Sequence, residues 1–381
     1  MTVLIDYTKG FFETTEGDGV GTVTGNATLD LSTGSVFSHT PTANTTFAFS
    51  NPPASGTASS ATLKLTGANV VAGYDLANAS YDSVSLSVIS EESLGHDIFF
   101  KPDGTKVYLL GTSGDDVNEY SLSTAWDLST ASYSQNFSVS AQEANPSGIF
   151  FKPDGTKMYI TGTSGDDVNE YNLSTAWDIS TASYSQVFSV AAQMGNPRAI
   201  FFKGDGTKMF IADQTGPDIN EYSLSTGWDV STASFTQLFS TSSQATSPQA
   251  IYFSPDGTEM FVGDAASDIY KYSLSTAWDL STASYASITF DASSQNTVLL
   301  GLSFKDDGSK MYTFDNQTDA IYQYSTTGSS ALATITYPSS VIWSGGTTPT
   351  APANGETDVY TFYTDDGGTT YYGFQVGDAL A

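Results

Sequence analysis

Short apolar runs separated by polar turns recur along most of this chain with a period of 51 residues. In the copy that spans residues 149–190, apolar residues occupy 149–151 and 158–160, and apolar and polar residues alternate over 168–173. A fourth run covers 185–190. Runs this short, with a period of two, are typical of β-strands, and no window shows an apolar stripe of helical period. Each repeat is therefore predicted to hold four short strands, which we name A to D in chain order.

Turn residues mark the repeat as clearly as its strands do. An Asp-Gly pair separates strands A and B, where Asp can bond back to the backbone and Gly accepts a positive φ. It recurs at 103/104, 154/155, 205/206, 256/257 and 307/308. Four strands in a repeat of this length are typical of one blade of a β-propeller.

A Trp-Asp connector precedes strand D in four of the copies. Its tryptophans are Trp126, Trp177, Trp228 and Trp278. They could form ligand platforms, but near-identical copies favour a structural role in which each Trp packs over a blade edge.

The array begins and ends partway through its unit. Residues 74–88 supply a connector and strand D alone, and 301–324 supply strands A, B and C without D. We therefore predict a five-bladed propeller over residues 68–331, closed by an N-terminal strand that completes the last blade. Both chain crossings are then expected on the face of the Asp-Gly turns. The opposite face, with the B–C and D–A loops, is expected to be free for binding.

The flanking residues lack the repeat but keep the pattern of alternating strands. Neither flank looks large enough to bury a good core alone. We predict one small domain, sandwich-like or barrel-like, from residues 1–67 and 332–381, with the propeller inserted into it. Two separate caps are the alternative. The predicted strands are 27–31, 46–49, 61–65, 334–338, 341–343, 358–363 and 370–374, the last two forming a hairpin.

Four flanking segments resemble a β module of bacteriophage tail fibres and related virion appendages. They read LDLSTGSVF, TTFAFSNPPASGTASSATLKL, ATITYPSSVIWSGGTTP and DVYTFYTDDGGTTYYGF, and the resemblance covers about 90 residues. It implies a tail-fibre or capsid-decoration protein on the virion surface, assembled in the host cytoplasm. It also implies other virion proteins as partners and self-association, commonly as a homotrimer. The element PDGTKMY resembles YVTN-like propeller repeats, which say little about function.

Charge narrows the range of partners. Twelve Lys and Arg residues stand against 41 Asp and Glu residues, so the net charge is −29. Such a chain offers no basic patch for nucleic acid or an anionic membrane. It has no cysteine, which excludes disulfides. No signal peptide and no membrane-spanning stretch are expected from the pattern.

The D–A loops and the residues that enter strand A vary most between copies, as binding of a non-symmetric ligand would require. Relaxed surface drift is the alternative. Arg198 is the only arginine in the chain, and it could bind a carboxylate or an acidic sugar, or neutralise nearby acids. The candidate ligand-binding residues are His96, Glu143, Asn145, Asn196, Arg198, Gln249 and Asn296.

Acids in the B–C loops could hold Ca²⁺ through oxygen ligands, although no run matches an EF-hand or a calcium-binding nonapeptide repeat. Solvated turn acids are the favoured interpretation, and no other cofactor is expected. The residues concerned are Asp115, Asp116, Asp166, Asp167, Asp218 and Asp268.

Catalysis finds little support in the sequence. The two histidines, His39 and His96, fall in different predicted domains, and no nucleophile elbow, zinc-protease motif or phosphate loop is present. We therefore expect a virion surface protein, without enzymatic activity, that displays a propeller for attachment to a host glycan. The alternatives are a lectin-like or Ca²⁺-dependent module of a bacterial surface protein and, less favoured, a polysaccharide hydrolase.

Overall fold

The chain folds into two compact β units. One is formed by Met1–Ala72 with Gly328–Ala381, and the other by Gly73–Thr327. The propeller predicted over residues 68–331 extends a few residues beyond the second of these units at each end. Residues 72, 328 and 329 of the predicted connectors fall outside the described residues. The computed structural model describes residues 3–6, 10–13, 26–41, 45–71, 73–327 and 330–380.

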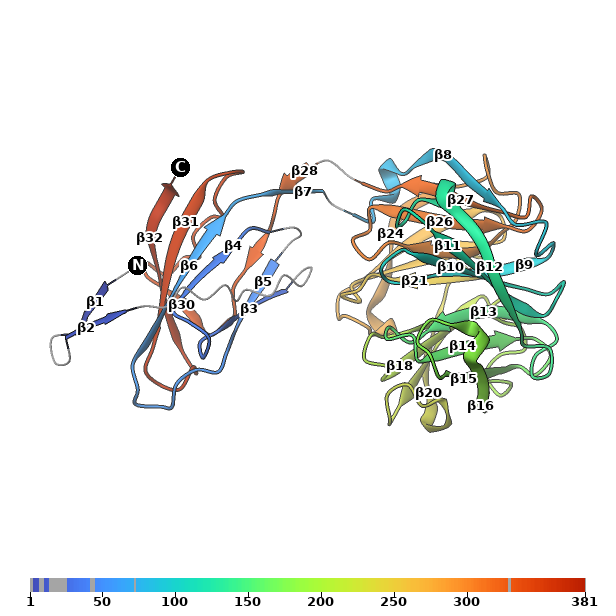
Figure 1. Ribbon diagram of the computed structural model, residues 1–381, viewed down its shortest axis with the longest axis horizontal. Helices are drawn as coiled ribbons and strands as arrows, with labels where there is room; N and C mark the ends of the chain where they lie inside the picture. Colours follow the sequence, from blue (N-terminus) through green and yellow to red (C-terminus); the bar gives the residue numbers. More distant parts are fainter. Residues whose placement is uncertain are drawn as a thin grey trace. The chain divides into compact units, whose positions relative to one another are not determined.

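The unit Gly73–Thr327 is a five-bladed β-propeller, and each blade is an antiparallel sheet of four strands (Figure 1). Blade 1 consists of β9 (Gly95–Phe100), β10 (Lys106–Gly111), β11 (Asp116–Leu122) and β12 (Ala131–Ser138). Blade 2 consists of β13 (Pro146–Phe151), β14 (Lys157–Gly162), β15 (Asp167–Leu173) and β16 (Ala182–Ser189). Blade 3 consists of β17 (Pro197–Phe202), β18 (Lys208–Asp213), β19 (Asp218–Leu224) and β20 (Ala233–Ser240). Blade 4 consists of β21 (Pro248–Phe253), β22 (Glu259–Asp264), β23 (Asp268–Leu274) and β24 (Ala283–Asp291).

Blade 5 joins the two ends of the propeller, as the phase of the repeat predicts. Its strands are β25 (Leu299–Phe304), β26 (Lys310–Asp315), β27 (Ala320–Ser325) and the N-terminal β8 (Ser80–Ser87). The amide of Asp75 donates to the carbonyl of Thr326 at 3.0 Å, and the amide of Tyr74 donates to Gly308 at 2.7 Å. The chain therefore enters and leaves the propeller beside one Asp-Gly turn, and pairing of β8 with β27 closes the ring.

The apolar core of the propeller lies between the blades. One cluster joins Tyr159 of blade 2 to Phe202 and Tyr222 of blade 3, all of them fully buried. Similar clusters occupy the other blade boundaries, so each sheet is covered on both faces except at its outer edge.

Each Trp-Asp connector ties its blade to the preceding one. The Trp177 ring stacks on Phe151 and Phe99. The backbone carbonyl of Trp177 accepts a hydrogen bond from the Tyr108 hydroxyl at 2.9 Å. The ring also covers Gly155, where a Cβ would lie 2.4 Å from the indole. These contacts are those of a structural device, and Trp126, Trp228 and Trp278 repeat the stacking on their own blades. Short 3₁₀ turns follow at η1 (Leu76–Asn78), η2 (Leu128–Thr130), η3 (Ile179–Thr181), η4 (Val230–Thr232) and η5 (Leu280–Thr282).

The second unit is built from both ends of the chain and contains two main sheets. A three-stranded sheet has the order β29-β5-β3, and a five-stranded sheet the order β30-β32-β31-β6-β4. In Figure 1 the blue β6 and the red β31 run side by side, and they pair in antiparallel register. The strands are β3 (Asn26–Asp30), β4 (Val36–His39), β5 (Thr45–Ser50), β6 (Ser59–Thr66), β29 (Ile335–Thr336), β30 (Val341–Trp343), β31 (Thr357–Thr364) and β32 (Tyr371–Leu380). Two further two-stranded pairs are β1 (Val3–Asp6) with β2 (Gly10–Glu13) and β7 (Asn69–Val71) with β28 (Ser330–Leu332).

The strands from β3 to β6 alternate between the two main sheets of this unit. As a result β3 and β5 run parallel in one sheet, and β4 and β6 run parallel in the other. Their inward side chains meet in one core, in which Leu29, Phe47 and Leu63 are buried together with Tyr360 and Phe362. Residues from the N-terminal and C-terminal flanks thus share a single core.

Within the described residues, no helix is both long enough and apolar enough to cross a bilayer.

Candidate functional site

The five A strands (β9, β13, β17, β21 and β25) surround the central channel, because each contacts the next and β25 contacts β9. Two ends of this channel carry distinct chemistry. At the end where the A strands begin lie His96, Ser147, Arg198, Gln249 and Leu300, which we call the Arg198 mouth. At the other end, beside the Asp-Gly turns, aromatic side chains line a cavity that we call the aromatic funnel.

Polar side chains of blades 3 and 4 converge at the Arg198 mouth. The Nε and Nη2 atoms of Arg198 both donate to Oε1 of Gln214, the former at 3.0 Å, and Asn196 donates to the same oxygen at 2.9 Å. The Gln214 amide in turn donates to the Ser247 hydroxyl at 2.9 Å, which also accepts from Gln249 at 3.1 Å. Three of the predicted residues, Asn196, Arg198 and Gln249, therefore belong to one network.

Gln214 is the centre of this network, and reasoning from the sequence did not single it out. It follows strand B of blade 3, at the position of Thr112 in blade 1 and Thr163 in blade 2. The available signal was a glutamine where blades 1 and 2 have a threonine, in the same blade as the only arginine of the chain.

Arg198 differs from the lysines of the propeller because it has no carboxylate partner among the described residues. Every lysine between residues 73 and 327 forms an ion pair with a carboxylate. Arg198 has only the neutral Gln214 as side-chain partner among the described residues. Burial lowers the pKa of its guanidinium, yet an arginine stays charged at neutral pH. The Arg198 mouth therefore holds a cation without an anionic partner.

His96 lies in the same region. Burial, and then the charge of Arg198, lower the pKa of the His96 imidazole to about 4. The ring is therefore neutral at physiological pH, so that one of its nitrogens can donate a hydrogen bond and the other can accept one. A neutral imidazole leaves Arg198 as the charge that an anion would meet.

Glu143 and Asn296 occupy equivalent D–A loop positions but lie inside the protein. Glu143 is fully buried, and its carboxylate accepts the backbone amides of Asn145 at 2.7 Å and Ser164 at 3.1 Å. Asn296 is 1% exposed and donates to Thr313 at 3.0 Å. Both side chains shape loops, so they are not accessible to a ligand.

Asn145 remains at the surface, where its amide donates to the Ser164 hydroxyl at 2.8 Å. It lies on the blade 2 loop and takes no part in the Arg198 network.

The acids of the B–C loops are mostly held by neighbouring amides. Asp116 accepts from Asn118 and Asn136, each at 2.6 Å, and Asp167 accepts from Asn169 at 2.6 Å. Burial, and then the charge of Glu143, raise the pKa of Asp167 to about 6. Asp218 and Asp268 likewise accept from Asn220 and Tyr270.

Asp115 and Asp166 have a positive φ of 46° and 45°, as turn residues. In the described part of the chain, no three histidine, aspartate or glutamate residues converge as a metal site would require. Calcium binding in these loops stays a prediction.

The two histidines lie in different units. His39 is buried in the smaller unit, 3.5 Å from the Thr45 hydroxyl, and His96 lies in the propeller.

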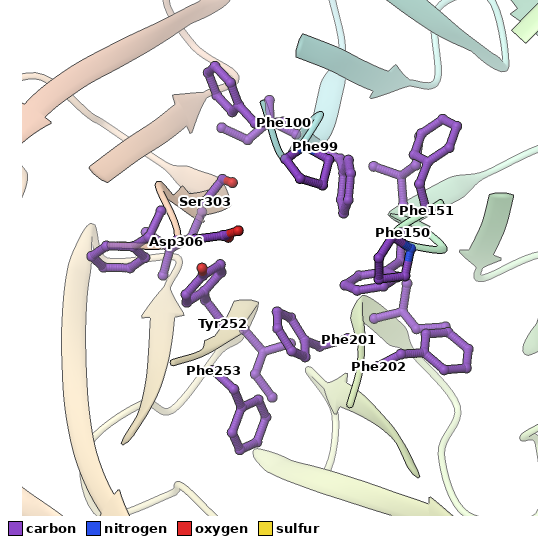
Figure 2. Close-up of a pocket in the computed structure, with 18 of the residues that line it drawn as sticks. Phe99, Phe100, Phe150, Phe151, Phe201, Phe202, Tyr252, Phe253, Ser303 and Asp306 are labelled. Carbon is purple, nitrogen blue, oxygen red and sulfur yellow. The ribbon is translucent and has the colours of Figure 1, made fainter. Parts of the chain in front are cut away.

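The aromatic funnel has a volume of about 280 Å³ and is the feature that the sequence analysis missed. Its walls come from the next-to-last residue of each A strand, namely Phe99, Phe150, Phe201, Tyr252 and Ser303. Figure 2 shows these side chains around an open centre, with Phe100, Phe151, Phe202 and Phe253 further out. The doubled aromatic at the end of strand A is the signal in the sequence, where residues 149–151 predict only an apolar strand.

No protein-family model and no curated protein matches this chain. Several solved structures are similar to it in fold. A presumed 6-phosphogluconolactonase from Bacteroides uniformis is 15% identical, covers 61% of this chain and 69% of its own, and has a TM-score of 0.39. A protein from Lactobacillus plantarum is 16% identical, with coverages of 64% and 72% and a TM-score of 0.39. A protein of unknown function from Desulfotomaculum acetoxidans is 11% identical, with coverages of 75% and 84% and a TM-score of 0.37. Similarity at this level carries no argument about activity.

Proposed function

We propose that this chain is a non-enzymatic binding protein of a virion surface appendage, and that the Arg198 mouth contacts an acidic glycan of the host surface. The observation that carries the binding role is the unpaired cation. In a chain of net charge −29, Arg198 is the one basic side chain of the described propeller without a carboxylate partner.

The surroundings of Arg198 favour a carboxylate ligand. Gln214 holds the guanidinium through two of its five N–H donors, which leaves three donors for a ligand. A guanidinium binds a carboxylate through two parallel hydrogen bonds. Asn196 and Ser247 lie close by as half-buried neutral polar groups, of the kind that bind sugar hydroxyls, whereas Gln249 is 2% exposed and supports Ser247 from inside.

The appendage role rests on the resemblance of the flanking segments to a tail-fibre module. In such a protein the unit built from both chain ends anchors the chain to other virion proteins and self-associates as a homotrimer. The propeller is then inserted into that unit as the displayed part. A tail-fibre and a capsid-decoration position are both consistent with this arrangement.

Binding to acidic glycans is tested with a glycan array and two variants on the same blade. Arg198→Gln removes the cation from the Arg198 mouth. Lys203→Gln removes the same charge just beyond the other end of strand β17, where Lys203 pairs with Asp205 at 2.8 Å. We expect binding of sialylated or uronic-acid glycans to fall about tenfold or more in Arg198→Gln, because a charge-assisted contact contributes about 1.5–3 kcal/mol. Lys203→Gln is expected to bind normally.

Equal binding by Arg198→Gln and the parent chain would exclude the Arg198 mouth as the glycan site. If a chelator abolishes glycan binding and Arg198→Gln binds as tightly as the parent chain, the Ca²⁺-dependent lectin is favoured instead. Release of sugars from surface polysaccharide would favour a hydrolase.

The appendage role needs a separate measurement. Light scattering is expected to give the mass of a trimer, and electron microscopy of purified particles with a specific antibody is expected to label their surface. A monomer that is never found on particles would contradict the appendage role and leave the glycan result standing.

A further inference from the structure

The aromatic funnel is a built cavity at the opposite end of the channel from Arg198. Three contacts between neighbouring rings form most of its wall: Phe99 with Phe150 at 5.2 Å between centroids, Phe150 with Phe201 at 5.1 Å, and Phe201 with Tyr252 at 5.4 Å. All three are edge-to-face contacts. Because a cavity of ~150 Å³ lined by apolar side chains can admit benzene, about 280 Å³ leaves room for a small organic molecule.

Blade 5 breaks the aromatic ring with polar residues. Ser303 stands where the other blades have Phe or Tyr. Three residues on, Asp306 takes the place of a proline or glycine in the other turns. In Figure 2 the Asp306 carboxylate points toward the open centre, on the side where the Tyr252 hydroxyl lies. One sector of an otherwise apolar wall is therefore acidic.

The charge of Asp306 is not used inside the protein. Its neighbour Lys305 pairs instead with Asp307, at 2.6 Å. The Tyr74 hydroxyl donates to the backbone carbonyl of Asp306 at 2.8 Å, but no described residue donates to the Asp306 carboxylate. Crowding by protein atoms, and then the charge of Asp307, raise the pKa of Asp306. The charge of Lys305 partly offsets that of Asp306, and the exposed carboxylate stays open to a cation that enters the funnel.

A second carboxyl group lines the cavity further along strand β9. Asp97 is 4% exposed, and its two oxygens accept the amides of Ile98 at 2.9 Å and Ile149 at 3.0 Å. The corresponding residues of the other blades are Gly148, Ala199, Ala250 and Gly301, so only blade 1 places an acid at this depth. Burial raises the pKa of the Asp97 carboxyl group to about 8, so this group is mostly neutral at pH 7 and Asp306 supplies the negative charge of the lining.

The aromatic rings and the Asp306 carboxylate select the same kind of ligand. The negative face of an aromatic ring attracts a cation, and desolvated contacts of this kind contribute about 2 kcal/mol. Anions are repelled by Asp306, and a strongly hydrated metal ion finds too few oxygen ligands among phenyl rings. We propose that the aromatic funnel binds a small organic cation with an apolar body, a quaternary or aryl-alkyl ammonium compound.

This inference is independent of the glycan proposal, because none of its residues belongs to the Arg198 network. The test uses the full chain and isothermal titration calorimetry with benzyltrimethylammonium as the probe. Benzyl alcohol and benzoate serve as the neutral and anionic probes with the same ring. We expect saturable binding of the cation at one site per chain, at least tenfold tighter than that of benzyl alcohol, and no binding of benzoate.

Two substitutions separate charge from shape. Asp306→Asn keeps the size of the side chain and is expected to weaken cation binding about tenfold, as loss of a charged contact does. Phe150→Leu keeps an apolar wall without the ring, and we expect a loss of about threefold or more. Asp291→Asn is the matched control, because it changes the net charge equally at an exposed position on β24 and is expected to leave binding unchanged.

Three results would overturn the proposal. One is equal affinity for benzyl alcohol and the cation, which would make the cavity merely apolar. Another is equal binding by Asp306→Asn and Asp291→Asn. The third is absence of cation binding by the folded parent chain. If Phe150→Leu fails to fold, as thermal melting would show, the comparison of the two Asp→Asn variants still decides.

Discussion

A reversed ion pair in blade 4 gives a quantitative test of how the blades are held together. In blades 1 to 3 strand B supplies a lysine and strand C a glutamate, as in Lys106 with Glu119 at 2.7 Å. In blade 4 strand B supplies Glu259 and strand C supplies Lys271, again at 2.7 Å. We predict that exchanging the two residues of blade 4 is tolerated, whereas either substitution alone is destabilising.

The magnitude follows from the geometry of the pair. Two unit charges about 4 Å apart attract each other by roughly 4 kcal/mol at an effective dielectric constant of about 20. The side chains are 13% and 29% exposed, so solvent reduces this attraction, and about 2 kcal/mol is a reasonable net value. Lys271 also donates to the Tyr74 carbonyl at 3.2 Å and lies 5.6 Å from the centre of the Phe261 ring.

The single and double variants should therefore differ sharply. Lys271→Glu turns attraction into repulsion and removes the donor to Tyr74, so we expect a loss of about 3–4 kcal/mol. Glu259→Lys should lose about 2–3 kcal/mol for the same electrostatic reason. In the double variant a lysine stands on strand B, from which Lys208 reaches the carbonyl of Trp278 at 2.7 Å. That lysine can restore both contacts, and the double variant is expected within about 1 kcal/mol of the parent.

Urea unfolding followed by tryptophan fluorescence measures these differences. Four of the five tryptophans lie in the propeller, so the signal reports mainly on that unit. The dependence of the free energy of unfolding on urea concentration should be the same in all four proteins. If the losses of the two single variants simply add in the double variant, the pair is not coupled and the electrostatic reasoning is refuted.

Two further predictions concern backbone strain and a buried acid. Gly155→Ala should destabilise the propeller by about 2 kcal/mol or more, because Gly155 has a φ of 73° and its new Cβ would lie 2.4 Å from Trp177. Gly195→Ala is the control, because its new Cβ meets no atom within 4 Å. Equal melting temperatures of the two variants would contradict the prediction. Burial raises the pKa of Asp97 to about 8, so the folded chain keeps a proton that the unfolded chain releases above pH about 4. The free energy of unfolding should therefore fall as the pH rises from about 4 to about 8, by up to about 1.4 kcal/mol per pH unit from this group. Urea unfolding of Asp97→Asn at several pH values should show that contribution removed, and an unchanged slope would contradict the assignment.

The repeat in the sequence was sufficient to predict the propeller. Period-two alternation specifies strands, and Asp154-Gly155 with its copies specifies where the chain turns. The incomplete units at both ends determined the number of blades and the closing strand, because a lone strand D can be paired only by the blade that lacks one. The observed pairing of β8 with β27 follows that reasoning.

The candidate site was predicted less completely, for reasons that lie in tertiary contacts. Variable loop positions drew attention to Arg198, but the sequence did not reveal that Gln214 would hold it or that Glu143 would turn inward. A glutamate usually faces solvent, and only the folded loop supplies the backbone amides that hold Glu143 inside the protein. Side-chain direction in irregular segments depends on contacts between residues distant in the chain.

By itself the sequence determined the strand order, the turns and the joining of the two propeller ends, because these depend on local periodicity and on the phase of a repeat. Only the tertiary structure decided that Phe99, Phe150, Phe201 and Tyr252 meet around one cavity and that Asp306 faces it. The four aromatic residues occupy one position of the 51-residue repeat, which places them around the channel, but the repeat does not show whether their side chains fill the end of the channel or leave it open. Closing the ring brings them together, and it leaves unfilled the space at the end of the channel where a ligand can bind.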